Sequence, residues 1–130
     1  MTMPLLLDTH IFIALVEGRF GDLPKSIRQE MEGSGQELYL SVASLWEISI
    51  KWRIGKLPLN AAPESLPEAA RNADITLLHI TEDHALAHVE PEPPTRDPFD
   101  RLLLAQCAVE GMRLVTIDAA LADHPLSAMA

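Results

Sequence analysis

Short apolar runs alternate along the chain with longer segments in which apolar residues recur every three or four positions. The run at residues 3–7 stops at Asp8, and apolar residues then recur at helical spacing over residues 11–16. The same pattern predicts strands at residues 3–7, 38–40, 75–78 and 112–117. It predicts helices at residues 11–16, 24–31, 42–54, 68–72, 81–89 and 99–110, with a short helix after Asp118.

Glycine, serine and proline mark the boundaries of these elements. Gly55 and Gly111 each follow the last periodic residue of a predicted helix. Ser41 and Ser44 are the two candidate N-caps of the helix that begins near them. Residues 90–98 contain four prolines, so we expect a stiff surface connection there and no regular structure.

The alternation of strands and helices predicts the fold class. A strand–helix–strand connection is right-handed in nearly all proteins, and such units build a mainly parallel sheet with helices on both faces. We therefore predict an α/β protein with three layers, α/β/α, and a central sheet of about four or five strands. A chain of 130 residues has the size of one domain, so the predicted single domain spans residues 1–130.

The composition is that of an ordinary globular protein, with 48% hydrophobic and 22% charged residues. The apolar runs are far shorter than the roughly 20 residues that a membrane-spanning helix needs, and no signal-peptide pattern is present. We therefore expect a cytoplasmic protein without a membrane span. Cys107 is the only cysteine, which excludes an internal disulfide, and its apolar neighbours predict a buried structural thiol.

The formal net charge of −9 counts against a protein that binds nucleic acid through a basic surface. Acids clustered around divalent cations explain part of this excess, because bound metal supplies positive charge where a phosphate approaches. Leaving four such acids out of the count still leaves −5. A metal site of four acids therefore explains only part of the negative net charge.

Four acids stand where parallel strands deliver side chains to one edge of a sheet. Asp8 follows the first predicted strand and Asp118 follows the last, while Glu47 and Asp100 lie in the first turns of two helices. Ligands bind beyond the carboxyl ends of the strands in open parallel sheets, so we expect the four acids to converge. Each acid taken alone also suits a turn, an N-cap or a helix N-terminus.

Glu47 and Asp100 are both surrounded by apolar residues in the sequence, and a carboxylate is rarely buried without a partner. This favours a metal site, and hard oxygen ligands suit Mg²⁺ or Mn²⁺. Zinc is not expected: among five histidines, His84 and His88 are spaced i, i+4 but lack the HExxH pattern. We interpret both as residues of a surface helix.

Such a metal site predicts hydrolysis of phosphodiester bonds without a covalent intermediate. Thr9 and Thr116 are candidates to hold a ligand carboxylate, although threonine beside a strand also suits the strand itself. Five basic residues are candidates to guide the phosphates of a nucleic acid, or else form solvated ion pairs: Lys51, Arg53, Lys56, Arg96 and Arg101. Trp46 is expected in the core, and Trp52 is left open between the core and base stacking.

Three segments together resemble the PIN-domain proteins, and in particular the VapC-like ribonuclease toxins of bacterial VapBC toxin–antitoxin pairs. The segments are LLLDTHIFIAL at 5–15, SVASLWEISIKWRIGKLPL at 41–59 and RDPFDRLLLAQCAVEGMRLVTIDAAL at 96–121. Their order and spacing cover nearly the whole chain. The resemblance implies that Asp8, Glu47, Asp100 and Asp118 are the catalytic and metal-binding acids.

The resemblance also implies Mg²⁺ or Mn²⁺ as cofactor, single-strand-accessible RNA as substrate, a homodimer, and inhibition by a VapB-like antitoxin. Asp97 competes with Asp100 as a ligand; we prefer Asp100, because Pro98 suits the first helical position and leaves Asp97 as the N-cap. Apolar residues near 11–16 or 27–31 are expected on the antitoxin-binding surface. The alternatives are a catalytically silent PIN-like domain that binds RNA or protein, and an acid phosphotransfer domain with a strand-end aspartate.

Overall fold

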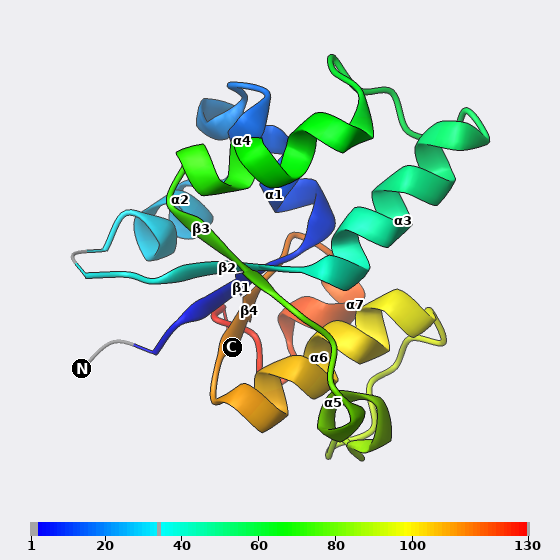
Figure 1. Ribbon diagram of the computed structural model, residues 1–130. Coiled ribbons are helices and arrows are strands. Elements are labelled where there is room, and N and C mark those ends of the chain that lie inside the picture. The colour runs from blue at the N-terminus through cyan, green and yellow to red at the C-terminus, as the bar shows by residue number, and fades with distance from the viewer. Residues whose placement is uncertain (1–2, 34, 130) are drawn as a thin grey trace.

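The computed structural model describes residues 3–33 and 35–129 of the chain. A parallel sheet lies at its centre, made of β1 (Leu5–Leu7), β2 (Leu38–Ser41), β3 (Ile75–Leu78) and β4 (Arg113–Val115). The strands lie in the order β3-β2-β1-β4, and every neighbouring pair is parallel (Figure 1). The predicted α/β class and the parallel sheet are confirmed.

Helices connect the strands throughout the described residues. The α-helices are α1 (Thr9–Val16), α2 (Lys25–Met31), α3 (Val42–Arg53), α4 (Leu66–Asn72), α5 (Glu82–Leu86), α6 (Pro98–Glu110) and α7 (Ala119–Ala122). Two short 3₁₀ helices, η1 (Phe20–Asp22) and η2 (Pro63–Ser65), precede α2 and α4. Every predicted helix is therefore present, and the differences lie at the ends.

Several element boundaries differ from the prediction by one to three residues, and three of these differences have local reasons. The fourth strand ends at Val115 instead of residue 117, because its neighbouring strand in the sheet, β1, ends at Leu7. α5 ends at Leu86 instead of residue 89, because Ala87 has an extended backbone with φ −65° and ψ 137°. α4 begins two residues early, since Pro67 fits the first turn of a helix.

Alternate residues of the central strands face opposite layers. Leu5 and Leu7 pack into one hydrophobic core with residues of α1, α2 and α4, whereas Leu6 packs into a second core with residues of α6 and α7. Val115 and Leu114 of β4 divide between the two cores in the same way. This is the period of two that a strand imposes on its side chains. Helices therefore cover both faces, in the predicted three layers (Figure 1).

The carboxyl ends of all four strands lie at one edge of the sheet, because the strands run in the same direction. After β1, the side chain of Asp8 caps α1. After β2, Ser41 and not Ser44 caps α3, and its hydroxyl accepts a hydrogen bond from the Ala43 N–H at 3.0 Å. After β4, Asp118 caps α7. Three neighbouring strands thus deliver polar side chains to this edge.

The expectation that Trp46 belongs to the core is wrong, since this residue is 63% exposed. The next two positions of α3, Glu47 and Ile48, are the buried ones, so Trp46 lies on the outward side of the helix. Trp52 is also exposed, to 43%. The apolar residues around Glu47 correctly predict that this acid is buried. They also predict that Trp46 is buried, and this is wrong.

The interpretation of His84 as a surface residue is also wrong. His84 is 1% exposed and lies where α5 packs on α6, with its Nε2 2.7 Å from Oε2 of Glu110. Its Nδ1 accepts a hydrogen bond from the Thr81 N–H at 3.0 Å, which closes a capping box at the start of α5. His88 is exposed, as predicted.

Cys107 is buried, as predicted, and burial raises the pKa of its thiol to about 12. A thiol that holds its proton so strongly is a poor nucleophile, which agrees with a structural role. Within residues 3–33 and 35–129, no helix is long and apolar enough to cross a membrane. The predicted single domain of residues 1–130 includes residues 1–2, 34 and 130, which lie outside the described part of the chain.

Candidate functional site

Asp8 is buried at the carboxyl edge of the sheet, where it is 6% exposed. Its Oδ1 accepts a hydrogen bond from the Thr9 N–H at 2.7 Å, and its Oδ2 accepts one from the Thr116 hydroxyl at 2.6 Å. Burial raises the pKa of this carboxyl, and the hydrogen bond from Thr116 opposes that rise. Two strands that are neighbours in space therefore hold the Asp8 carboxylate in a fixed position.

Glu47 is the second buried acid and is 7% exposed. Its Oε1 accepts a hydrogen bond from the Thr9 hydroxyl at 2.6 Å, and that hydroxyl also lies 3.0 Å from Oγ of Ser44. Its Oε2 accepts from Nζ of Lys51 at 2.6 Å, and this hydrogen bond raises the pKa of the Lys51 ammonium. Thr9 therefore joins the two buried acids, through its backbone to Asp8 and through its hydroxyl to Glu47.

Asp97 and Asp100 lie at the start of α6. Asp97 is the N-cap, as predicted, and its Oδ1 accepts a hydrogen bond from the Phe99 N–H at 2.8 Å. Asp100 lies in the first turn and is partly buried, with its Oδ2 3.4 Å from the Thr95 hydroxyl. Asp100 therefore has the freer carboxylate of the two.

The pKa of Asp100 is raised to about 7, first by burial and then by the negative charges of four other acids. These acids are, in order of effect, Asp97, Asp8, Asp118 and Glu47. Like charges raise the pKa of a carboxyl only when they lie near it, so the five groups gather in one region. We call this set of five acids the carboxylate site.

Asp118 is the most open member of the carboxylate site. It is exposed, its Oδ1 accepts a hydrogen bond from the Ala120 N–H at 2.9 Å, and its own N–H donates to the Thr116 hydroxyl oxygen at 3.0 Å. The Thr116 hydroxyl therefore donates to Asp8 and accepts from the backbone of Asp118. One threonine side chain ties the first strand-end acid to the last.

The donor set of the carboxylate site suits a hard divalent cation, because carboxylate oxygens are the ligands that Mg²⁺ and Mn²⁺ prefer. Over residues 3–33 and 35–129, no three His, Cys, Asp or Glu side chains stand close enough together to hold a metal ion. Oxygens of Asp8 and Glu47 are occupied instead by hydroxyl and ammonium donors. The repulsion that raises the pKa of Asp100 is the kind that a bound cation relieves, so the residues fit such a group in chemistry and charge.

Comparison with known protein families matches residues 5–125 to the PIN domain. The match covers the sheet, α1 to α7 and every acid of the carboxylate site. The chain belongs to the PIN-domain family. PIN domains are generally nucleases that use divalent metal, which implies a nucleic acid substrate. A comparison with curated proteins gave no match.

The five candidate cations of this PIN domain differ in their partners and in their exposure. Lys51 is paired with Glu47, and the Arg101 guanidinium binds the preceding loop through Glu92 and the Thr95 carbonyl. The remaining three candidates are exposed, with Arg53 donating to Ser49 on its own helix: Arg53, Lys56 and Arg96. Contact with RNA stays a prediction for all five candidate cations.

The sequence analysis allowed an ion pair for Lys51 but did not identify Glu47 as its partner, and it did not predict the contact of Ser44 with Thr9. The signal for Lys51 was present, since Glu47 and Lys51 are spaced i, i+4, the spacing that brings helix side chains together. Ser44 lies one helical turn before Ile48 on the buried side of α3, so its position next to Thr9 depends on how α1 meets α3. No local pattern in the sequence predicts that contact.

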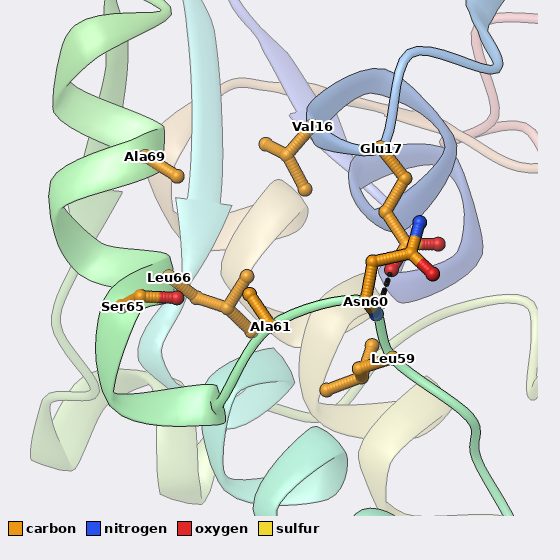
Figure 2. A pocket seen from close by; sticks show the side chains of 8 residues that line it. All are labelled: Val16, Glu17, Leu59, Asn60, Ala61, Ser65, Leu66 and Ala69. Atoms are coloured by element: carbon orange, nitrogen blue, oxygen red, sulfur yellow. Dashed lines mark hydrogen bonds between the residues drawn. The ribbon is translucent and has the colours of Figure 1, made fainter.

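The prediction of an exposed apolar patch on the early helices is wrong for most of its residues, because they are buried. Ile11, Ile27 and Met31 are core residues with at most 7% exposure. Val16 is half-buried and lines a cavity of about 270 Å³ between α1 and α4 (Figure 2). Glu17 at its rim accepts a hydrogen bond from the Asn60 N–H at 2.8 Å, as Figure 2 shows. This cavity of the PIN domain is separate from the carboxylate site.

Proposed function

We propose that this PIN domain is a Mg²⁺- or Mn²⁺-dependent endoribonuclease that hydrolyses RNA phosphodiester bonds in the cytoplasm. The single observation that carries the proposal is the gathering of Asp8, Glu47, Asp97 and Asp118 of the PIN domain around Asp100, whose pKa these acids and burial raise to about 7. Carboxylates crowded in this way destabilise the folded protein while they are ionised and have no bound cation, and a divalent cation is the ligand that their charge and chemistry suit.

The proposed metal ligands are Asp8, Glu47, Asp100 and Asp118, and Asp97 serves as the helix cap. When bound, a divalent cation lowers the pKa of a water molecule and neutralises the charge that develops on the phosphate. Thr9 orients Glu47, because its hydroxyl donates to that carboxylate at 2.6 Å.

We propose that Thr116 and Lys51 hold the metal-binding acids in position without binding the metal themselves. Thr116 holds Asp8 and the Asp118 backbone. The Lys51 ammonium offsets part of the negative charge at Glu47 while the site has no cation. We propose that three exposed cations attract the RNA backbone: Arg53, Lys56 and Arg96. A chain of net charge −9 needs such local positive charge to bind a phosphate backbone.

RNA cleavage with added Mg²⁺ or Mn²⁺ tests the function. We expect Asp8→Asn and Asp100→Asn each to lower cleavage at least about 100-fold, because each removes a charged oxygen from the reacting centre. The matched control is Glu68→Gln, an exposed acid of α4 outside the carboxylate site, which should cleave like the wild type. Unchanged cleavage in both aspartate variants would overturn the assignment.

A catalytically silent domain is the second candidate function. It is favoured by the hydrogen bonds that occupy oxygens of Asp8 and Glu47, with no metal-holding arrangement of three ligands among the described residues. This candidate predicts RNA binding without cleavage products at any Mg²⁺ or Mn²⁺ concentration. Product formation that requires Asp100 rejects it.

We propose further that the domain is the toxin of a toxin–antitoxin pair, forms a homodimer and is neutralised by a VapB-like antitoxin. The cavity between α1 and α4 supports a partner, because half-buried Val16, Leu59 and Ala69 line a space large enough for an apolar side chain (Figure 2). Co-purification with the product of the adjacent reading frame tests this. Ala69→Asp should abolish capture, while Glu68→Gln, its neighbour on α4, should retain it.

A further inference from the structure

Two aromatic side chains stand beside the carboxylate site, and the function proposed above leaves them unused. Trp46 is 63% exposed, and its ring packs edge-on against Phe99, with ring centroids 5.6 Å apart and an interplanar angle of 73°. Trp46 immediately precedes Glu47, and Phe99 immediately precedes Asp100. We call Trp46 and Phe99 the aromatic pair. The two elements that bring acids to the site therefore also bring these rings together next to it.

A tryptophan left this open to water is unfavourable without a partner, because its large apolar surface stays hydrated. The Phe99 contact orients the Trp46 ring and leaves most of the residue uncovered. A ring that is held in place and exposed at the same time presents a flat face to a ligand. Flat aromatic ligands are the chemical class that such a face binds best.

A cation follows the tryptophan on the same face of α3. Trp46, Ser49 and Arg53 are spaced i, i+3 and i+7, which places them in one row along the helix. Nη2 of Arg53 donates to Oγ of Ser49 at 3.2 Å, so the guanidinium lies along this row. Seven residues of helix place the Cα atoms of Trp46 and Arg53 about 10 Å apart along the axis, a distance that a short piece of nucleic acid strand covers.

We propose that Trp46, braced by Phe99, is a stacking platform for one base of single-stranded RNA beside the bond that is cut, with Arg53 contacting the adjacent backbone. This inference rests on the proposed endoribonuclease function and names a binding site for its substrate. Stacking on an aromatic ring tolerates every base, because all bases have a π-face. The platform positions the strand and takes no part in the chemistry.

A second copy of the chain is the competing occupant, and the arrangement of α3 favours RNA. Trp52, the other exposed tryptophan, lies six residues on and therefore about 120° around the helix from Trp46. A dimer contact centred on Trp52 leaves the aromatic pair open. The surface of the pair continues instead into the acids on one side and Arg53 on the other, which suits a ligand with both bases and phosphates.

The test compares Trp46→Ala, Trp46→Phe and the matched control Trp52→Ala on a single-stranded RNA of about 12 nucleotides, a length within the usual site size. We expect Trp46→Ala to raise KM roughly 5- to 100-fold with kcat changed less than about twofold, since one stacking contact is lost. Trp46→Phe should recover most of the loss. Trp52→Ala should stay within about twofold of the wild type, and all three should fold, because both tryptophans are exposed.

A scan of the same RNA with one base removed at a time identifies the stacked position. Binding is measured in EDTA. In the wild type, removal of the base at one position should weaken binding by a factor similar to the loss that Trp46→Ala causes with the intact RNA. In Trp46→Ala the same abasic position should cause no further loss, because the ring and the base are partners. An equal abasic penalty in both proteins overturns the proposal, and so does an unchanged KM in Trp46→Ala.

Two further outcomes separate this inference from the proposed function. If wild type does not cleave RNA but the abasic penalty depends on Trp46, the nuclease function fails and the stacking platform is supported. If Trp46→Ala changes the sedimentation coefficient from dimer to monomer and leaves RNA binding intact, the surface is a contact between copies and the platform is wrong.

Discussion

A single hydroxyl group connects the two ends of the candidate site. Thr116 donates to Asp8 at 2.6 Å and accepts from the Asp118 N–H at 3.0 Å, and it is 1% exposed. Asp8 and Asp118 are therefore positioned relative to each other by one side chain, although they are far apart in the sequence. Residues of this kind decide whether a cluster of acids has a defined geometry.

Thr116→Val keeps the shape of the side chain and removes both hydrogen bonds. We expect cleavage to fall about 10- to 100-fold and the free energy of unfolding to fall by about 1–2 kcal/mol, because the buried Asp8 carboxylate and the partly buried Asp118 N–H lose their partner. Cleavage kinetics and urea denaturation measure the two effects. Thr76→Val, on the exposed side of β3, is the control and should change neither. Full activity in Thr116→Val would show that the hydroxyl does not orient Asp8.

The charge of Asp100 predicts a pH-dependent stability. The pKa of Asp100 in the folded protein is about 7, above its ordinary value of 3.8, so between these values the folded protein binds a proton that the unfolded chain does not. Wild-type stability in EDTA should therefore rise as the pH falls from 8 towards 4. The ionised carboxylate destabilises the folded protein above pH 7, and partial exposure of the side chain reduces this cost.

Asp100→Asn removes this cost and should raise the melting temperature at pH 8 in EDTA by about 2–5 °C. The difference from wild type should shrink as the pH is lowered, because wild-type Asp100 becomes neutral as well. Thermal denaturation at pH 8, 6 and 5 measures it. A lower melting temperature for Asp100→Asn at pH 8 contradicts the argument that crowded charges destabilise this region.

At the level of the elements, α6 begins as the sequence predicts. Asp97 and Pro98 form a recognisable helix start, so the position of Asp100 in the first turn follows from local rules. The strand-end acids are equally local, because Asp8 and Asp118 directly precede α1 and α7. These features are encoded within a few neighbouring residues and could therefore be predicted without the structure.

The orientation of side chains around a helix could not be predicted in the same way. Trp46 is open and His84 is enclosed, the reverse of both expectations. Apolar periodicity identifies a helix but does not say where each face meets a neighbouring element. His84 is buried because α5 packs on α6, and Trp46 is exposed because the acid after it takes the inward position. Both outcomes depend on contacts between distant parts of the chain.

The buried histidine predicts a test of how α5 is held. His84→Ala leaves Glu110 and the Thr81 N–H without their partner and opens a cavity, so we expect a loss of about 2–4 kcal/mol in the free energy of unfolding. His88→Ala is the matched control, an exposed histidine in contact with Glu90, and should change stability by less than about 0.5 kcal/mol. Urea denaturation compares them, and equal effects would mean that His84 is not part of the packed structure.

At the level of the whole molecule, the net charge of −9 has a local counterpart in the carboxylate site. The other four acids of the site repel the charge of Asp100, so we expect a bound divalent cation to stabilise the fold as well as the site. This links metal binding to thermal stability through mass action.

Mn²⁺ or Mg²⁺ at about 100 times its Kd should stabilise the protein by about 2.7 kcal/mol, which corresponds to roughly 10 °C in melting temperature. Asp8→Asn and Asp100→Asn should lose most of this increase, while Glu68→Gln should keep it. Thermal denaturation with divalent chloride, against NaCl at equal ionic strength, makes the comparison. An increase that is the same in all variants indicates non-specific screening and contradicts a metal site among these acids.

The strand order β3-β2-β1-β4 has a consequence for the newly made chain. The strand nearest the N-terminus lies inside the sheet, and one of its two partners is β4, near the other end. The bond from Thr116 to Asp8 spans 108 residues. A polypeptide synthesised only as far as residue 112 has neither β4 nor Thr116, and its Asp8 lacks the neighbour that holds it. The proposed activity should therefore be absent until β4 and Thr116 have been synthesised, because Asp8 has no fixed position before then.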